Sequence, residues 1–270
     1  MIFESKKNNE PTYLAWPSGE WSNSLLKALA VAGIPIEGYQ ERRYAFSIPM
    51  LNIVANISRA GDVPKLVKNP STAPSIGIVG NDILQEYNLQ GPNNLCPPND
   101  RDYYMDFFPP LPLRQLVPTA PNPRLMWLRT PNAKKDPDDY DTYLQEWAKG
   151  TVYTSYPNLA AKNLPMGITL PIVENPTAVP YKDLPQGRIE KVAGKVESYW
   201  RNDSRNYYVA DIVDKGETAT ANELVEESYI LSSIYLLAII DESKAYLEDL
   251  RRLQDFLALL DIAVEKKEPR

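Results

Sequence analysis

The chain of 270 residues contains no histidine and a single cysteine, Cys96. Without histidine, the chain cannot perform Ser-His-Asp or Cys-His hydrolysis, build zinc sites with histidine ligands or shuttle protons through imidazole. A lone cysteine excludes an internal disulfide, and without a histidine to activate it Cys96 is a poor nucleophile. The reactions that remain are those that need neither an imidazole nor a thiolate.

Long apolar runs and dense basic tracts are also missing. The longest uncharged apolar stretch, residues 228–240, is too short to span a bilayer, and the N-terminus lacks the apolar core of a secretion signal. The net charge is -6 and the sequence pI is about 5.0, which argues against nucleic acid as a partner. We therefore expect a cytoplasmic chain, without a membrane partner, that acts on small molecules and has one or two domains.

Hydrophobic patterns alternate between strands and helices along most of the chain. In the first part, the patterns predict strands at residues 13–16, 44–48, 51–57 and 75–79, with helices at 22–32 and 62–67. In the second part, they predict strands at 124–128, 150–154, 189–192 and 209–213, with helices at 140–148, from 156 and from 194. This alternation indicates an α/β fold with mostly parallel sheets, which bind ligands at the carboxyl ends of their strands.

Two proline-rich tracts, residues 91–123 and 165–185, interrupt this rhythm and disfavour regular helix. The first is rich in tyrosine and phenylalanine, so we expect it to pack as a connection between lobes. After residue 243, which can cap a helix, leucines recur at steps of three and four residues. That stripe predicts a terminal helix that packs on the body of the protein or on another subunit.

A glycine turn rich in hydroxyl groups follows the strand at 209–213. Gly216 permits a tight reversal, and Thr218 and Thr220 place hydroxyls beside successive main-chain N–H groups. Such a turn can hold a phosphate, although an ordinary strand-to-helix turn with a capping threonine has the same pattern. Ser18 and Gly19, before the first helix, form either a second anion site or a plain connecting turn.

The glycine turn resembles the phosphoribosyl-pyrophosphate loop of the ATP phosphoribosyltransferases, the enzymes of the first step of histidine biosynthesis. The family pattern is Asp-x-Val-x-Thr-Gly-x-Thr-Leu followed by Asn-x-Leu, and the matching residues are Asp211, Val213, Gly216, Thr218, Asn222 and Leu224. Other short segments match in the same order along the chain: residues 17–19, 59–64, 77–82, 154–159 and 194–197.

The resemblance implies a two-lobed fold similar to the type II periplasmic-binding proteins, with a ligand cleft between the lobes. Residues 1–112 would form the first part of lobe I, 113–223 lobe II with the phosphate-binding loop, and 224–270 the return to lobe I with the C-terminal helix. The implied activity is Mg2+-dependent transfer of a phosphoribosyl group from phosphoribosyl pyrophosphate to N1 of the adenine of ATP, with release of pyrophosphate. This reaction needs no general base, because N1 attacks with its own lone pair.

The resemblance also implies site residues. The catalytic candidates are Arg59 for pyrophosphate, and Asp82 and Glu197 for hydroxyl or base contacts; Glu197 could equally be a favourable acid in the first turn of a helix. Asp211 would hold the loop or a magnesium-bound water, and Lys215 would face pyrophosphate. The remaining phosphate-binding candidates are Gly216, Glu217, Thr218, Ala219, Thr220, Ser18 and Gly19. Mg2+ would be the cofactor, without a dedicated protein cage.

The resemblance further implies a homo-oligomer of the short family form, which works with a regulatory subunit similar to histidyl-tRNA synthetase. Three cationic positions of the family are replaced here, by Gly61, Ser155 and Glu20, and Glu217 adds an acid within the turn. These departures leave two alternatives open. One is a divergent paralogue that uses another purine nucleotide in the biosynthesis of pentostatin-like nucleosides, and the other is a non-catalytic two-lobed binding or regulatory subunit.

Overall fold

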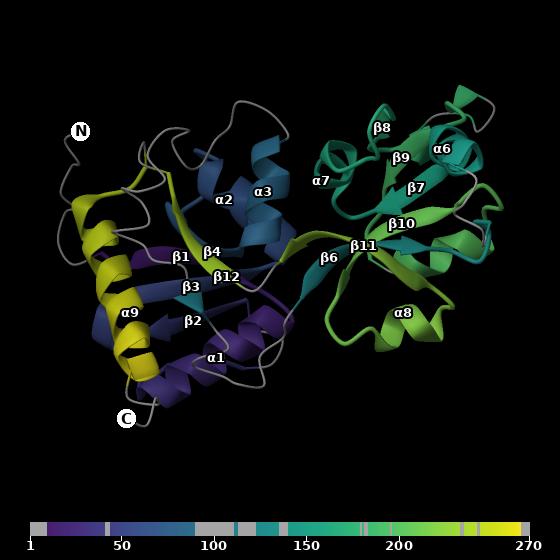
Figure 1. Cartoon of the computed structure of the whole chain (residues 1–270). Helices are drawn as coiled ribbons and strands as arrows, with labels where there is room; N and C mark the ends of the chain where they lie inside the picture. The colour runs from purple at the N-terminus through teal and green to yellow at the C-terminus, as the bar shows by residue number, and fades with distance from the viewer. Residues whose placement is uncertain are drawn as a thin grey trace. The chain divides into compact units, whose positions relative to one another are not determined.

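The computed structural model describes residues 10–40, 44–89, 111–112, 123–134, 140–178, 180, 183–194, 196–232, 235–241 and 244–265 (Figure 1). The chain forms two compact units. Unit 1 comprises Met1–Pro121 and Ile234–Arg270, and unit 2 comprises Asn122–Ser233. The chain therefore starts in unit 1, builds unit 2 as one continuous segment and returns to unit 1.

Unit 1 is built on a mixed sheet with the strand order β2-β3-β1-β4-β12-β5. Its strands are β1 (Thr12–Pro17), β2 (Ala45–Ile48), β3 (Ile53–Ser58), β4 (Ile76–Gly80), β5 (Leu111–Pro112) and β12 (Tyr235–Ile240). The central strands β3, β1 and β4 run parallel, whereas β12 is antiparallel to β4 and β2 is antiparallel to β3. The carboxyl ends of the three central strands therefore lie at one edge of the sheet.

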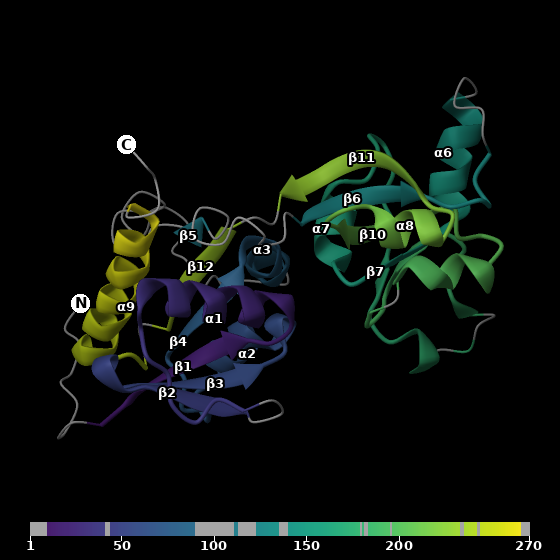
Figure 2. The ribbon, with the colours of Figure 1, turned by 90° about the horizontal axis from the view of Figure 1, so that it is seen from below.

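Helices cover both faces of the unit 1 sheet (Figures 1 and 2). One face packs against α1 (Glu20–Ala32) and α9 (Leu247–Glu265) through a core that includes Leu14, Trp16 and Phe256. The opposite face packs against α2 (Val63–Lys68) and α3 (Asn81–Leu89), where Ala15 and Val79 are buried. The alternation of neighbouring residues between the two cores follows the two-residue period of a strand.

A buried carboxylate fastens the start of α9 to the sheet. Asp249, only 1% exposed, accepts hydrogen bonds from the hydroxyl of Thr12 at 2.6 Å and from the hydroxyl of Ser75 at 3.2 Å. It also accepts a 2.9 Å hydrogen bond from the main-chain N–H of Tyr246. Three donors from separate parts of the chain thus neutralise the cost of burying this acid.

Unit 2 has a sheet of its own, with the order β11-β6-β10-β7-β9-β8. Its strands are β6 (Arg124–Arg129), β7 (Thr151–Thr154), β8 (Ile172–Val173), β9 (Arg188–Lys191), β10 (Tyr208–Val213) and β11 (Val225–Ser232). Strands β10, β7, β9 and β8 run parallel, and β6 lies antiparallel between β10 and β11. The segments that follow β8, β9 and β10 therefore leave the same edge of the sheet.

The two faces of the unit 2 sheet are covered by different kinds of element. The helices α6 (Tyr140–Lys149) and α7 (Pro157–Lys162) pack on one face, through an aromatic core that includes Trp127, Trp147 and Tyr208. The 3-10 helix η5 (Val196–Arg201) and the short helix α8 (Glu217–Ala221) pack on the other face against Tyr153 and Val209. Shorter 3-10 helices are η1 (Pro49–Leu51), η2 (Ala60–Asp62) and η3 (Pro176–Ala178).

The same strand order recurs in both units. In unit 1, three parallel strands in the order β3-β1-β4 are followed by antiparallel β12, and in unit 2 parallel β9-β7-β10 are followed by antiparallel β6. Each antiparallel strand is the first long strand that the chain forms after it changes unit. This repeated arrangement confirms the α/β fold, similar to the type II periplasmic-binding proteins, that the sequence predicted.

Several local expectations differ from the structure. The return to unit 1 was placed at residue 224, but β11 pairs with β6, so unit 2 continues to Ser233. The segment after Gly194 forms a 3-10 helix, and the second proline-rich tract contains β8. The terminal helix begins at Leu247, whereas residue 243 and most of residues 91–123 lie outside the described residues. The leucine stripe of this helix packs on the core of unit 1, which agrees with the expectation that it packs on the body of the protein.

Candidate functional site

The phosphate turn, defined here as residues 214–220, joins β10 to α8 in unit 2. Val213, at the end of β10, is buried, and Ala219 is buried on the same core, so the turn is anchored at both ends. Gly216 adopts the left-handed conformation with φ 77°. A Cβ at this position would be strained and would lie 3.3 Å from a carboxylate oxygen of Glu226. The glycine predicted from the sequence is therefore required by the turn.

Most main-chain N–H groups of the phosphate turn make no described hydrogen bond. In the part of the chain that the structure describes, no hydrogen bond is donated by the N–H groups of residues 215–219, and the first one in the turn is donated by Thr220 to the carbonyl of Gly216. Consecutive N–H groups around a left-handed glycine form a concave anion site. The turn therefore has two features of such a site, a left-handed glycine and N–H groups that make no described hydrogen bond.

Most side chains of the turn are exposed to water. Lys215, Glu217, Thr218 and Thr220 are all exposed, and Ala219 is the one residue of the predicted set that faces the core. An exposed ammonium and two exposed hydroxyls can contact a phosphate, whereas the exposed carboxylate of Glu217 can turn toward solvent. The turn therefore combines main-chain donors with side chains that can adjust to a ligand.

Two predicted site residues, Asp211 and Glu197, meet in unit 2. Asp211 lies in β10 and Glu197 in η5, and their carboxyl groups are within hydrogen-bonding reach of each other. Burial raises the pKa of Asp211 to about 7, and the neighbouring Glu197 adds to the rise, while the hydrogen bond from the N–H of Ile212 opposes it. The two carboxyl groups therefore share one proton up to a pH of about 7, because two ionised carboxylates this close would repel each other.

A tryptophan connects the carboxyl pair to the phosphate turn. The indole N–H of Trp200, in η5, donates a 3.0 Å hydrogen bond to the carbonyl of Asn222, which follows α8. Asn222 in turn donates through its side chain to the carbonyl of Thr218 at 2.9 Å. The asparagine of the matched motif thus ends α8, and η5 is held against the turn at the same point.

Sequence reasoning missed Glu226 and Arg124. Glu226, in β11, approaches Gly216, and Arg124 in β6 lies 3.4 Å from its carboxylate. The two residues are not register partners, since Arg124 pairs with Ser232 and Glu226 with Leu128, so their side chains meet along the sheet and not directly across it. The sequence offered no signal for this, since residues 225–232 were not predicted as a strand.

The predicted residues of unit 1 gather at the carboxyl ends of its parallel strands. The N–H of Ser18, after β1, donates to the carbonyl of Ser58 at 2.7 Å, and Arg59 follows β3 as an exposed side chain. Gly19 has φ 80° and precedes α1, and Asp82, in the first turn of α3, is 2% exposed. The hydroxyl of Ser58 is buried without a hydrogen-bond partner among the described residues. These positions place an arginine and a serine on one edge, while Asp82 is enclosed.

Metal ligands are sparse in the described part of the chain, where no group of three or more Asp, Glu, Cys or His side chains is placed to hold an ion. The Asp211–Glu197 pair offers two carboxyls. This number fits Mg2+, which takes one or two carboxylates and completes its shell with water and phosphate oxygens. The described helices also include none that is long and apolar enough to cross a bilayer.

Comparison with known proteins gives a consistent picture. No family model matches the chain. An ATP phosphoribosyltransferase from Moorella thermoacetica is 39% identical over 75 residues, which are 27% of this chain and 32% of that protein. The match therefore spans about a third of the length of this relative.

Among solved structures, a chain of the ATP phosphoribosyl transferase (HisG:HisZ) complex from Thermotoga maritima is similar with a TM-score of 0.59. The identity is 19%, and the alignment covers 95% of this chain and 100% of that chain. An ABC transporter structure from Clostridium perfringens gives a TM-score of 0.43 at 11% identity, covering 94% of this chain and 79% of that chain.

These comparisons first define the class: the chain has the two-unit α/β fold found in the Thermotoga chain. They also confirm the resemblance that the motifs indicated, because the matching Moorella sequence and the similar Thermotoga structure are both those of ATP phosphoribosyltransferases. At these identities and lengths, the likeness establishes the fold and the resemblance, and the chemistry has to be argued from the site.

Proposed function

We propose that this chain is a phosphoribosyltransferase that transfers the phosphoribosyl group of phosphoribosyl pyrophosphate to N1 of the adenine of ATP. The observation that supports this most directly is the phosphate turn, with left-handed Gly216 and N–H groups of residues 215–219 that make no described hydrogen bond. A ribose 5-phosphate carries the negative charge that such N–H groups bind. The resemblance to ATP phosphoribosyltransferases supplies the reaction.

In this reaction, the lone pair of N1 forms a bond to C1 of the ribose. The C1–O bond to pyrophosphate breaks, and its electron pair leaves with the pyrophosphate. The protein has to orient two substrates and stabilise the charge of the departing group. Neither task needs histidine, which agrees with its absence from the sequence.

The residues around the turn have distinct roles in this proposal. The N–H groups of the turn and the hydroxyls of Thr218 and Thr220 hold the 5-phosphate, and the ammonium of Lys215 faces the pyrophosphate. Asp211 and Glu197 would hold the waters of Mg2+, which supplies positive charge to the pyrophosphate when bound. In unit 1, Arg59 and Ser18 with Gly19 are the proposed anion contacts, and Asp82 is the proposed contact for a hydroxyl or base.

The alternative acceptor, another purine nucleotide, has its own support. Ser155 stands where the family has a lysine, and its hydroxyl donates a 3.0 Å hydrogen bond to the carbonyl of Val192. Gly61 is exposed and has no side chain to replace the lost arginine. Both positions therefore offer no cation to a triphosphate, which favours an acceptor with fewer phosphates.

Mass spectrometry tests the proposal. The protein is incubated with phosphoribosyl pyrophosphate, Mg2+ and each of ATP, ADP, AMP and the guanine nucleotides, and a product heavier by one phosphoribosyl group is expected with at least one of them. Thr218→Ala should lower kcat/KM by about tenfold or more, the effect of losing one hydrogen bond to a charged group. The matched control Thr169→Ala, an exposed threonine of unit 2 outside the turn, should retain the activity.

Absence of product with every acceptor would contradict the transferase. In that case, calorimetry with phosphoribosyl pyrophosphate distinguishes a binding or regulatory subunit from a protein that does not bind this ligand. Binding that Thr218→Ala weakens would indicate a two-lobed binding or regulatory subunit, and no binding would overturn the assignment of the phosphate turn itself.

The proposal also includes a cytoplasmic location, assembly into a homo-oligomer and association with a regulatory subunit. The Thermotoga structure is a complex of two kinds of chain, HisG and HisZ, which supports a search for a second subunit. Sedimentation of the purified chain, alone and after co-expression with a candidate subunit similar to histidyl-tRNA synthetase, tests both points.

A further inference from the structure

A cavity of about 460 Å3 lies within unit 2, where the chain leaves β8 and β9. Its volume is within the range of pockets that bind small molecules. The walls come from five places in the same unit: β7, the segment after β8, β9, the segment after β9, and η5. Because every lining residue belongs to unit 2, the cavity is defined without reference to unit 1.

The floor of the cavity is the face of the sheet that carries Tyr153, Arg188 and Glu190. Tyr153 is the register partner of Glu190 in the parallel pair β7–β9, and Arg188 lies two residues before Glu190, so all three share one face. Glu190 and Arg188 are 5% and 1% exposed and form an ion pair at 2.5 Å. Lys191 also lines the cavity, but its side chain alternates to the face of Ile189, so it contributes main chain.

Two tyrosine rings form one wall. Tyr153 and Tyr199 have ring centroids 4.8 Å apart and an interplanar angle of 34°. The hydroxyl of Tyr153 donates a 3.1 Å hydrogen bond to Asp203, which fixes the orientation of its ring. Tyrosine faces attract cations as well as apolar groups.

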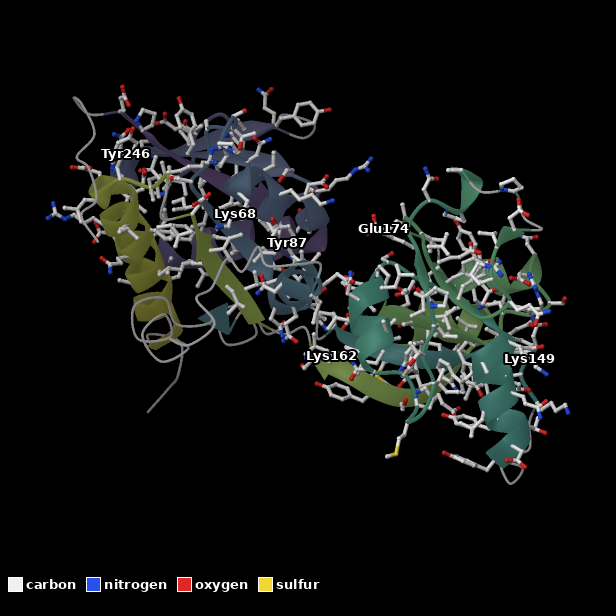
Figure 3. All side chains as sticks on the ribbon, turned by 90° about the horizontal axis from the view of Figure 1, so that it is seen from above. Lys68, Tyr87, Lys149, Lys162, Glu174 and Tyr246 are labelled. Atoms are coloured by element: carbon white, nitrogen blue, oxygen red, sulfur yellow. The ribbon has the colours of Figure 1, made fainter. Side chains whose placement is uncertain are left out.

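The lining also includes both polar and apolar side chains. The segment after β8 contributes the exposed carboxylate of Glu174, which Figure 3 labels at the surface of unit 2. It also contributes Asn175, whose side-chain amide oxygen accepts a 2.8 Å hydrogen bond from the hydroxyl of Thr177. Leu184 and Pro176 supply the apolar part. The cavity therefore offers an exposed acid and apolar contacts within one lining.

The charges of the cavity favour a cation over an anion. The guanidinium of Arg188 is already engaged, by Glu190 and by a 2.9 Å hydrogen bond to the carbonyl of Pro185. Two carboxylates line the cavity: Glu190, which is paired with Arg188, and the exposed Glu174. Burial raises the pKa of the Tyr153 phenol, and the negative charges of Glu190 and Asp203 raise it further against the opposing effect of Arg188. The charged groups near the Tyr153 phenol are thus two carboxylates, Glu190 and Asp203, and one guanidinium, Arg188.

We propose that this cavity is a second binding site, for a small organic cation that carries a primary ammonium group on an apolar body. The ammonium would contact the carboxylates of Glu190 and Glu174 and the faces of the tyrosines, and the apolar body would pack on Leu184 and Val192. The site is separate from the phosphate turn in its lining and in the charge it selects. It goes beyond the transferase proposal and does not depend on it.

Calorimetry with matched probes tests the charge preference. Benzylammonium is compared with benzyl alcohol and benzoate, which keep the ring and change the charge. We expect saturable binding of benzylammonium, with a dissociation constant on the order of 1 mM or below, and binding about tenfold or more weaker for the other two probes. Equal binding of the alcohol, stronger binding of benzoate or no saturable binding of any probe would each overturn the proposal.

Variants on walls away from the phosphate turn locate the site. Glu174→Gln should weaken benzylammonium binding by about threefold or more, as expected for an exposed charge pair. Glu37→Gln, which removes an exposed glutamate in unit 1, is the matched control and should change nothing. Leu184→Trp, which fills the cavity from its rim and leaves the buried ion pair intact, should abolish binding. If Leu184→Trp is folded by circular dichroism and still binds benzylammonium with unchanged affinity, the cavity is not the site.

Discussion

The two units share a strand order but bury their charges for different purposes. In unit 1, Asp249 accepts hydrogen bonds from Thr12, Ser75 and Tyr246, and thereby fastens α9 to the sheet. In unit 2, the Asp211–Glu197 pair lies next to the phosphate turn, and the Arg188–Glu190 pair forms the floor of a cavity. The comparison shows that sheets with the same strand order can use a buried charged side chain in two ways, either to hold a helix on the sheet or to line a candidate binding site.

The largest change in the free energy of unfolding that would test this contrast is expected in unit 2. Glu190→Ala leaves Arg188 buried without its carboxylate, and breaking such a pair costs about 3–5 kcal/mol of the free energy of unfolding. The double variant Arg188→Met with Glu190→Leu removes both charges and should recover most of that loss. Urea unfolding followed by circular dichroism measures both.

A double variant as unstable as Glu190→Ala would show that the ion pair itself stabilises unit 2. The pair would then be a structural bond, like Asp249 in unit 1, and the contrast between the units would fail. The contrast would be sharper if the double variant recovered its stability but no longer bound benzylammonium. The ion pair would then be needed for the ligand and not for the fold.

The next effect is expected in unit 1. Asp249→Ala removes the acceptor for two hydroxyls and one N–H, and should lower the free energy of unfolding by about 3 kcal/mol. Asp255→Ala, an exposed position on the same helix, is the matched control and should change it by less than about 0.5 kcal/mol. Equal effects of the two variants would show that the hydrogen bonds of Asp249 do not hold α9.

Much of this framework could be read from the sequence because local patterns decide it. The strand at 13–16, the helix at 22–32 and the strand at 75–79 correspond to β1, α1 and β4, whose apolar positions follow the periods of strand and helix. The phosphate turn was also predictable, since a glycine between a buried strand and hydroxyl residues is a local signal. Its left-handed Gly216 confirms that expectation of the turn's geometry.

The features that were missed depend on contacts between distant parts of the chain. Strand β11 has exposed glutamates at successive positions, so it lacks the alternation of a half-buried strand and is recognisable from its pairing with β6. Strand β8 is two residues long within a proline-rich tract. The cavity beside β9 required both β8 and the register of β7 with β9, and no window of sequence contains that information.

The site residues divide in the same way. Asp211 and Glu197 were each predicted from a motif, but their shared hydrogen bond depends on how η5 packs on β10. Arg59, Ser18 and Asp82 were placed correctly at the ends of parallel strands, since strand order sets that edge. Their roles in catalysis stay proposals, because strand order fixes position and says nothing of substrate contact.

A smaller effect is expected from the backbone of the phosphate turn. Gly216→Ala forces a Cβ into the left-handed region, at a cost of about 1–2 kcal/mol, and brings it within 3.3 Å of Glu226. Gly167→Ala imposes the same strain at φ 84° where no atom lies within 4 Å, so it is the matched control for stability. We expect phosphoribosyl pyrophosphate to bind about tenfold or more weakly to Gly216→Ala alone, as measured by calorimetry.

Equal affinity of the two glycine variants for phosphoribosyl pyrophosphate would separate the turn from ligand binding. The turn would then be a plain connection between β10 and α8, and the contrast between the units would no longer include a ligand site at the turn.

The smallest effect concerns the proton of the Asp211–Glu197 pair. The pKa of Asp211 is raised from 3.8 to about 7 in the folded chain, so between these values the folded state binds more protons than the unfolded state. The stabilisation from protonated Asp211 is therefore complete below about pH 4 and is lost as the pH rises through about 7.

Asp211→Asn keeps a neutral side chain at every pH, so its melting temperature should fall less than that of the wild type between pH 5 and pH 8. Asp183→Asn, at an exposed position of unit 2, should follow the wild type. If Asp211→Asn shows the same pH dependence as the wild type, the pair does not share a proton, and the buried acids of unit 2 are held by hydrogen bonds in the manner of Asp249.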